Sequence, residues 1–245
     1  MLKEAVFISD LHLHPDEQII TRRFNQFIDW AAVSTRTLYI LGDFFHVWPG
    51  DDGLEPWSVA ILNRLKWLSE QGVAIYFMPG NRDFLIGSHF IEQAGMTLLM
   101  EPSVVEFGST LVLLVHGDKY CTKDRGHQWL RKLTRNRIFP KFFLKLPFRL
   151  RYKIVKGARL LSQSHRYNPD TMNVVPEAMI SDMQHHQVKT LVHGHTHKPG
   201  LTKHLINDEF YRQFVLSDWD DSPQILCYDK TKGFYFIQFI PLEDL

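Results

Sequence analysis

The sequence has few features of a secreted or membrane-embedded protein. It has only two cysteines, Cys121 and Cys227, which do not form a metal-binding pair, so we expect buried thiols in a reducing compartment. No apolar run approaches the roughly 18 residues that a transmembrane helix needs. There is no internal repeat, low-complexity tract or linker, and the net charge is only +1 over 245 residues. These absences are typical of one globular domain with ample material for a core.

The first residues, Met1 to Ala5, lead directly into an apolar run, without the pattern of a signal peptide. We therefore expect a cytoplasmic protein, or one bound peripherally to the inner leaflet.

Five short polar motifs each follow an apolar run that is rich in β-branched or aromatic residues. The motifs are Asp10-Leu11-His12, Gly42-Asp43, Gly80-Asn81-Arg82-Asp83, His116-Gly117-Asp118 and Gly194-His195-Thr196-His197. The runs before them predict buried strands at 6–8, 38–41, 74–78, 111–115 and 190–192. Because the carboxyl ends of parallel strands meet at one edge of a sheet, we expect the motifs to converge there.

The side chains of these motifs offer carboxylate, amide and imidazole ligands, but no thiolate. The candidate metal ligands are Asp10, His12, Asp43, Asn81, His116, His195 and His197. This mixture favours Mn²⁺, with Fe²⁺ or Zn²⁺ as alternatives. Two ions about 3.5–4 Å apart need one ligand that touches both, which a carboxylate does best, and we assign that role to Asp43.

We expect the remaining ligands to divide into two sets. The first ion takes Asp10, His12 and His197, and the second takes Asn81, His116 and His195. A bridging water, acidified by both charges, then serves as the attacking hydroxide. A single motif of this kind can also be a turn or a helix cap. Five in this order, each at the end of an apolar run, favour a metal site.

In their order these motifs resemble the calcineurin-like metallophosphoesterase superfamily. The resemblance implies an α/β fold in which a two-sheet sandwich is flanked by helices (αββα). Most members have histidine after the asparagine of the third motif, whereas this chain has Arg82. Arg82, the stretch from Gly42 to Asp52 and the stretch from His116 to Asp124 are similar to the pyrophosphohydrolases of lipid A biosynthesis in Gram-negative bacteria.

That similarity implies a substrate and a reaction. The expected substrate is UDP-2,3-diacylglucosamine, cleaved at the phosphorus next to uridine into UMP and 2,3-diacylglucosamine 1-phosphate. The expected catalytic residues are Asp43, Asn81, Arg82 and His116. A soluble nucleotide or cyclic-nucleotide phosphodiesterase is one alternative, and a non-catalytic metal-bound scaffold is another.

Arg82 can also be interpreted from its chemistry. A guanidinium stays protonated near neutral pH, so it is no general acid, but it binds phosphate well. A permanent cation fits a reaction whose leaving group is a weakly basic phosphate, as in a pyrophosphate linkage. The alternative is a surface ion pair with Asp83.

Positive charge is concentrated between residues 119 and 166. This stretch has fifteen Lys and Arg against one acid, Asp124, whereas the rest of the chain has 13 basic and 26 acidic residues. Bulky apolar side chains are interleaved with these charges. We expect short helices that form an inserted cap at about 122–170, with basic faces for an anionic membrane surface and apolar faces for acyl chains. A solvated helix face or a grip on single-stranded nucleic acid is the alternative; we expect neither nucleic acid nor an obligate protein partner.

The resemblance also implies substrate contacts. The positions concerned are Asn81, Arg82, Asp124, Ser164, Asn168, Thr171 and His195. Thr171 replaces a family lysine and His127 a family tyrosine, so the sequence departs from the pattern at these two positions.

Three further histidines and three further apolar runs lie outside the metal motifs. We expect His193 in the core or behind the ligands, His46 in a structural or exposed position, and His14 either donating to a substrate phosphate or capping a helix. Apolar runs at 214–216, 224–228 and 234–239 predict antiparallel strands that close the second sheet.

Overall fold

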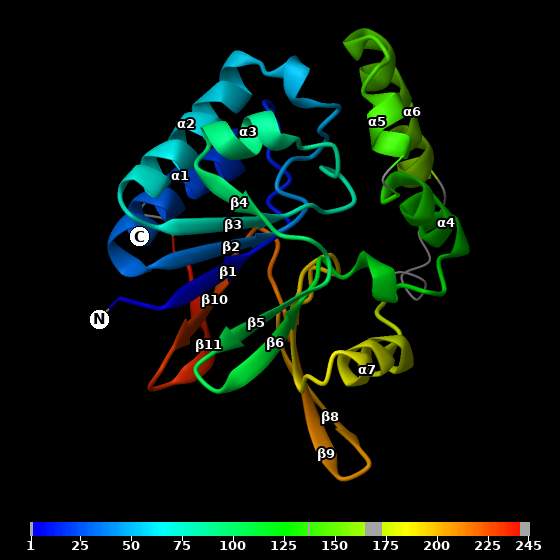
Figure 1. Cartoon of the computed structure of the whole chain (residues 1–245). Helices are drawn as coiled ribbons and strands as arrows, with labels where there is room; N and C mark the ends of the chain where they lie inside the picture. The colour runs from blue at the N-terminus through cyan, green and yellow to red at the C-terminus, as the bar shows by residue number, and fades with distance from the viewer. Residues whose placement is uncertain (1, 137, 165–172, 241–245) are drawn as a thin grey trace.

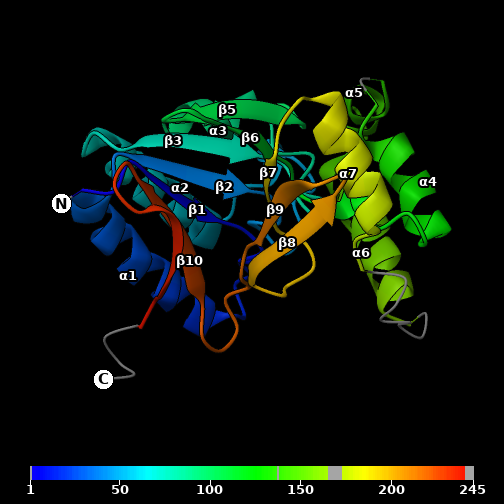
Figure 2. The same ribbon diagram turned by 90° about the horizontal axis from the view of Figure 1, so that it is seen from below.

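Two β-sheets packed face to face, with helices on their outer faces, form the body of the protein (Figure 1). The computed structural model describes residues 2–136, 138–164 and 173–240 of the chain. Figure 2 shows the same layers from below. The predicted αββα arrangement is therefore what the chain adopts.

The first sheet has six strands in the order β11-β10-β1-β2-β3-β4. Strands β1 to β4 are parallel, and β10 and β11 add to the edge in antiparallel pairing. The strands are β1 (Ala5–Ile8), β2 (Thr37–Leu41), β3 (Ala74–Met78), β4 (Met96–Leu98), β10 (Gln224–Asp229) and β11 (Gly233–Gln238). Three helices connect the parallel strands, as right-handed crossovers require. They are α1 (Gln18–Ser34), α2 (Pro56–Glu70) and α3 (Ser88–Gln93).

The second sheet has five strands in the order β5-β6-β7-β9-β8. The strands β6, β7 and β9 are parallel, while β5 and β8 are antiparallel to their neighbours at the two edges. The elements are β5 (Ser103–Phe107), β6 (Thr110–Leu114), β7 (Thr190–His193), β8 (Gly200–Ile206), β9 (Glu209–Val215) and the covering helix α7 (Pro176–His185).

The prediction for the last three strands was partly wrong. β9 belongs to the second sheet, but it pairs parallel with β7. β10 and β11 extend the first sheet instead, where β10 pairs with β1. An apolar run predicts a buried strand but does not specify the strand beside it. Both sheets have buried faces, so the same apolar pattern is compatible with either sheet.

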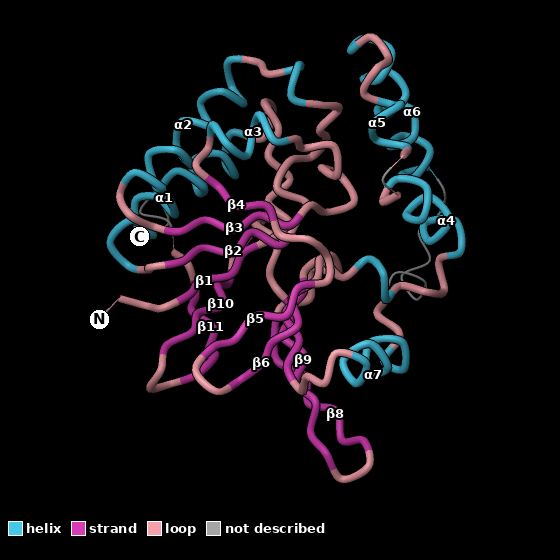
Figure 3. The backbone as a smooth tube through the Cα atoms, viewed as in Figure 1, coloured by secondary structure: helices cyan, strands magenta, loops and turns pink. Residues whose placement is uncertain are grey.

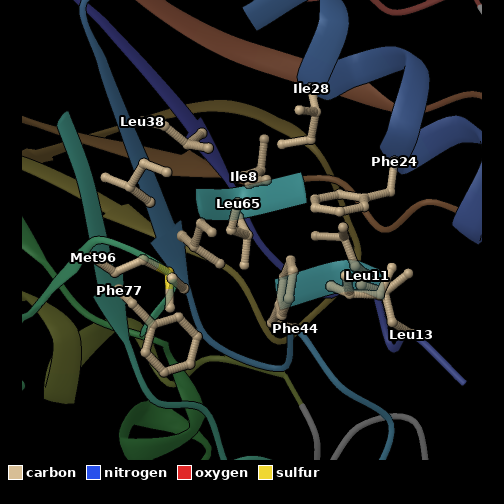
Figure 4. Close-up of a cluster of buried hydrophobic side chains, with 14 of the residues drawn as sticks. Ile8, Leu11, Leu13, Phe24, Ile28, Leu38, Phe44, Leu65, Phe77 and Met96 are labelled. Carbon is tan, nitrogen blue, oxygen red and sulfur yellow. The ribbon is translucent and has the colours of Figure 1, made fainter. Parts of the chain in front are cut away.

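Alternation along the strands explains how the layers pack. In β1, Val6 and Ile8 face the helices, while Ala5 and Phe7 face the second sheet, as the two-residue period of a strand requires. Figure 4 shows the helix-facing cluster, in which Phe24 and Leu65 meet Ile8 and Leu38. A third cluster, which includes Met179 and Leu191, joins α7 to the second sheet.

The basic stretch is helical and stands beside the sandwich, opposite the carboxyl ends of the first sheet's strands (Figure 1). Its helices are α4 (Arg125–Thr134), α5 (Phe139–Phe143) and α6 (Phe148–Ser164), and we call them the cap helices. Short 3-10 turns at Asp51–Gly53 and Asp118–Tyr120 lie in the loops that follow β2 and β6. Within the described ranges, no helix is long and apolar enough to cross a membrane.

A buried arginine attaches α6 to the loop that follows β2. Arg151 is 1% exposed and donates to the carbonyl oxygens of Leu146 (2.9 Å) and Pro49 (2.5 Å), and it pairs with Asp52. A Cβ on Gly50 would clash with this guanidinium, so the loop needs glycine there. The cap helices are thus joined to the loop that leaves Asp43.

Candidate metal centre

The five polar motifs converge at one edge of the sandwich. They follow β1, β2, β3, β6 and β7, and the loops that carry them gather between the sheets and the cap helices (Figure 3). Five candidate ligands also have left-handed backbone conformations, with φ between 52° and 68°: Asp10, His12, Asp43, His195 and His197. Such conformations are uncommon outside glycine and cluster at functional sites.

Asp10, His12 and His197 form the first group of potential ligands. One ligand atom from each lies within 4.8 Å of the others. The Asp10 Oδ1 atom is 3.5 Å from His197 Nε2 and 4.0 Å from His12 Nε2. Asp10 Oδ2 accepts hydrogen bonds from the Ser9 hydroxyl (2.5 Å) and the His195 amide (2.8 Å), whereas the buried Oδ1 has no hydrogen-bond donor. That oxygen, surrounded by imidazoles, fits a cation.

Asp43, His116 and His195 form the second group, under the same 4.8 Å criterion. The Asn81 side-chain oxygen lies 3.0 Å from His116 Nε2, so the amide that we expect to be a ligand lies beside this group. His116 Nδ1 is 2.9 Å from the carbonyl oxygen of Leu41. A carbonyl can only accept, so Nδ1 carries a proton, and in the neutral ring Nε2 is then free to bind a metal.

The carboxylate of Asp43 lies between the two groups. Its Oδ2 is 3.4 Å from His12 Nε2 in the first group, and its Oδ1 is 3.5 Å from His116 Nε2 in the second. Each oxygen therefore faces a different group. This is the arrangement that a bridging ligand needs.

The histidines of the two groups differ in how strongly they hold a proton. Burial alone would lower the pKa of both His116 and His197, but nearby carboxylates outweigh it. Asp43 and Asp10 raise the pKa of His116 to about 9, and bonds to Asp10 and Asp218 raise that of His197 to about 10. Burial and the charge of His116 lower the pKa of His195 to about 3.

Asp218 is a supporting residue that our sequence interpretation missed. Its carboxylate lies 3.3 Å from His197 Nδ1, so it can orient that ring and favour binding through Nε2. Asp218 follows the apolar run at 214–216, in the same way that the other motifs follow their strands. That position after an apolar run is the sequence feature that could have identified Asp218 as part of the site.

Asp83 does not form a surface ion pair with Arg82. It is fully buried, and its carboxylate accepts from the backbone amides of Gly80 (2.7 Å) and Phe44 (2.7 Å). Burial and the charge of Asp43 raise its pKa to about 6. Asp83 therefore joins the loops after β2 and β3. The alternative interpretation of Arg82, a surface ion pair with Asp83, is wrong.

Arg82 instead lies beside the Asp43 carboxylate, at the rim of the two groups. Its Nε is 3.0 Å from Asp43 Oδ2, yet the N–H is not aligned with that oxygen, so the distance is that of an ion pair without a good hydrogen bond. Its Nη1 is 3.5 Å from His46 Nδ1. The guanidinium is thus close to the carboxylate and partly exposed. His46, which we interpreted as structural or exposed, lies beside it.

Several other candidates occupy supporting positions. The Asp124 carboxylate accepts from the His127 amide (2.9 Å) and caps α4. His193 is satisfied on both nitrogens, by the carbonyl of Gly194 and the amide group of Gln213, which agrees with the expected core position. His14 accepts from the Asp16 amide (3.3 Å).

Three predicted substrate contacts lie outside the described part of the structure. Ser164 ends α6, and its side chain is outside the described part of the structure. Asn168 and Thr171 lie in the stretch 165–172, which is also outside the described residues.

The chain is similar to known proteins over most of its length. A family model described as calcineurin-like phosphoesterase matches residues 5–199. Proteins named UDP-2,3-diacylglucosamine hydrolase from Pseudomonas putida, Pseudomonas entomophila and Pseudomonas fluorescens are 42%, 43% and 43% identical over 236 residues. Those alignments cover 96% of this chain and 98%, 98% and 95% of the three relatives. A solved structure of an archaeal phosphodiesterase is 14% identical, with a TM-score of 0.46. The match covers 96% of this chain and 98% of the archaeal chain, and we draw no functional argument from it.

Metal loading is expected to release protons. Because His116 and His197 have raised pKa values, both are protonated at pH 7.5 in the metal-free protein, and both must lose a proton to bind a metal. Metal affinity should therefore rise with pH through the neutral range. Calorimetric titration with Mn²⁺ in buffers of different ionisation enthalpy measures the released protons. Binding without proton release at pH 7.5 would contradict the assignment of these two histidines.

Asp43→Ala should abolish the binding of both ions together with turnover. Removing the shared carboxylate leaves two cations without the negative charge that holds them close. Equilibrium dialysis followed by metal analysis measures the loss, and Asp16→Ala, which changes an exposed aspartate outside both groups, is the matched control. Two tightly held ions in Asp43→Ala would show that Asp43 does not bridge.

Proposed function

This chain belongs to the calcineurin-like phosphoesterase family, and we propose that it hydrolyses the pyrophosphate bond of UDP-2,3-diacylglucosamine. The products are 2,3-diacylglucosamine 1-phosphate, an intermediate of lipid A biosynthesis, and UMP. The observation that carries this proposal is the carboxylate of Asp43 shared by two ligand groups, with Arg82 at their rim. Relatives that match over nearly the whole chain carry the name of this reaction.

The protein is a metal-dependent hydrolase, and we propose that it holds two Mn²⁺ ions. The donors fit, because they combine carboxylate, amide and imidazole, and the buried Asp10 Oδ1 accepts no hydrogen bond and faces two imidazoles. When bound, two such ions neutralise phosphoryl oxygens and acidify a water molecule for attack on phosphorus.

The protein's own residues divide the remaining tasks. Asp43 holds the two groups together, and Asn81 and His116 flank its Oδ1 side. The guanidinium of Arg82 binds the oxygens of the scissile diphosphate and stabilises the charge that develops on the leaving phosphate. Such a leaving group needs charge stabilisation more than a proton. This explains why position 82 has an arginine, where most family members have a histidine.

The two alternative functions fit less well. A non-catalytic scaffold does not require seven potential ligands in two compact groups. A soluble nucleotide phosphodiesterase does not require cap helices that expose large apolar side chains, such as Phe142 (64% exposed) and Trp129 (68%).

We further propose that the cap helices bind the cytoplasmic face of the inner membrane in a Gram-negative bacterium. Some of the charge counted from sequence is used internally. Lys119 pairs with Asp182 of α7, and Arg131, Arg135 and Arg151 contact acids or carbonyl groups of the loops. Exposed cations and apolar side chains nevertheless alternate along α5 and α6. This outer cap surface consists of Lys141, Phe142, Lys145, Leu146, Arg149, Leu150, Tyr152, Lys153 and Lys156. Such a surface suits anionic lipid headgroups at the membrane where an acylated substrate resides.

Arg82→Ala should lower kcat by a hundredfold or more, since loss of one strong charge stabiliser in the transition state costs about that much. The content of bound metal should stay unchanged. Steady-state hydrolysis of UDP-2,3-diacylglucosamine together with metal analysis checks both. Arg36→Ala, an exposed arginine just before the opposite end of β2, is the control. An unchanged rate in Arg82→Ala would remove this residue from the active site.

Replacing Lys141, Lys145 and Arg149 together with glutamine should weaken vesicle binding by about a hundredfold at low salt. Each basic residue near an anionic surface contributes about 1 kcal/mol, and salt screens that attraction. Sedimentation with vesicles of phosphatidylethanolamine and phosphatidylglycerol measures the change. The control replaces three lysines remote from the cap helices, Lys66, Lys203 and Lys232. Equal vesicle binding by the two triple variants would contradict the proposed membrane surface.

A further inference from the structure

One face of α4 lies against the candidate metal centre. His127, Arg131 and Arg135 are spaced four residues apart, so they project from the same side of the helix. All three are partly buried, whereas Trp129 and Lys132 on the other side are exposed. α4 is the cap helix whose side chains reach the motif loops through three successive turns.

Arg131 makes the central contact. Its Nη2 donates to Glu101 Oε2 (2.8 Å), and its Nε donates to Asp118 Oδ1 (3.1 Å). Both acids are buried in the floor of the site, with 5% and 0% of their side chains exposed. The second oxygen of Glu101 accepts from the backbone amide of His116 (2.9 Å). A chain of charged hydrogen bonds therefore runs from α4 to the backbone of a candidate metal ligand.

The two neighbouring turns contact His195 and the loop that carries Asn81. The His127 ring stacks on the His195 ring, with centroids 5.7 Å apart and an interplanar angle of 30°. Its Nε2 lies 3.5 Å from Asp118 Oδ2. Arg135 Nη2 donates to the carbonyl of Pro79 (2.9 Å), two residues before Asn81.

These contacts all concern the second group. The first group has supports of its own, because Ser9 donates to Asp10 and Asp218 lies beside His197. The two halves of the centre are therefore held by different parts of the chain. One half is supported from within the sandwich and its loops, and the other also from α4.

We propose that Arg131 is a positioning residue for the second metal group, and that α4 is consequently a structural part of that group. The proposal rests on the two-metal site proposed above. Partners of this kind, which hydrogen-bond to metal ligands from behind, typically change metal affinity 10- to 100-fold when they are removed. Because coupling between two equilibria is reciprocal, metal bound at the second group must also stabilise the docked position of α4.

Titration with Mn²⁺ alone tests this without any measurement of catalysis. The wild-type chain should bind two Mn²⁺ ions, with the signal of a magnetically coupled pair by electron paramagnetic resonance. Arg131→Leu should bind the first ion as tightly as the wild type and the second about 10- to 100-fold more weakly, so that an uncoupled six-line spectrum persists to higher Mn²⁺ concentration. Lys132→Gln, the exposed neighbour on the same helix, should behave as the wild type.

Two results would overturn the inference. Arg131→Leu could bind both ions with wild-type affinity, or lose affinity equally at both sites. A wild-type chain that binds fewer than two Mn²⁺ ions would instead overturn the two-metal site itself, and this inference with it.

Arg131→Lys serves as a second variant if Arg131→Leu does not fold. Arg131→Lys retains the charge but cannot span both acids with a rigid fork, so the second Mn²⁺ should again be weakened selectively. In the wild type, Mn²⁺ should slow amide hydrogen exchange in 125–134 and leave α2, at 56–70, unchanged. Unaltered exchange in α4 together with unaltered affinities in Arg131→Lys would refute the coupling.

Discussion

The carboxylate of Asp43 is the contact through which the two halves of the candidate centre meet. Its two oxygens face different ligand groups, and the chain approaches so closely that neighbouring residues have little freedom. A Cβ on Gly80 would clash with the backbone and carboxylate of Asp43, and one on Gly42 would clash with Gly80. The loop also holds Asp43 itself in a left-handed conformation, with φ of 52°. This strained backbone conformation occurs at the residue whose side chain faces both ligand groups.

Charge balance around that carboxylate explains the surrounding arrangement. Asp10, Asp43 and Asp83 are all buried at the same edge, where three uncompensated acids could not coexist. Asp83 is satisfied by backbone amides, and the other two face imidazoles that hold protons until a metal replaces them. Arg82 adds a permanent cation at the rim. The imidazoles and Arg82 therefore balance the buried carboxylates in the metal-free site.

The sequence predicted the local features well and the distant partnerships poorly. Apolar runs that end in polar motifs were enough to predict the five central strands and their convergence, since both follow from rules about consecutive residues. The family assignment and the αββα fold were confirmed by the comparisons. The placement of β10 and β11 failed, because a run such as 224–228 carries no information about which sheet it joins. Charge counting likewise could not separate Arg131 and Arg151, which are paired internally, from the exposed Lys141 and Lys145. Asp218 and Glu101 were missed because their roles depend on residues far away in the chain.

The position of attack on the pyrophosphate tests the account most directly. Hydrolysis of UDP-2,3-diacylglucosamine in ¹⁸O-labelled water, with Mn²⁺ present, should give UMP that carries one ¹⁸O atom and unlabelled 2,3-diacylglucosamine 1-phosphate. This outcome requires water to attack the phosphorus next to uridine while the lipid phosphate leaves. Label in the lipid phosphate, release of UDP, or no hydrolysis by the Mn²⁺-loaded protein would contradict the account.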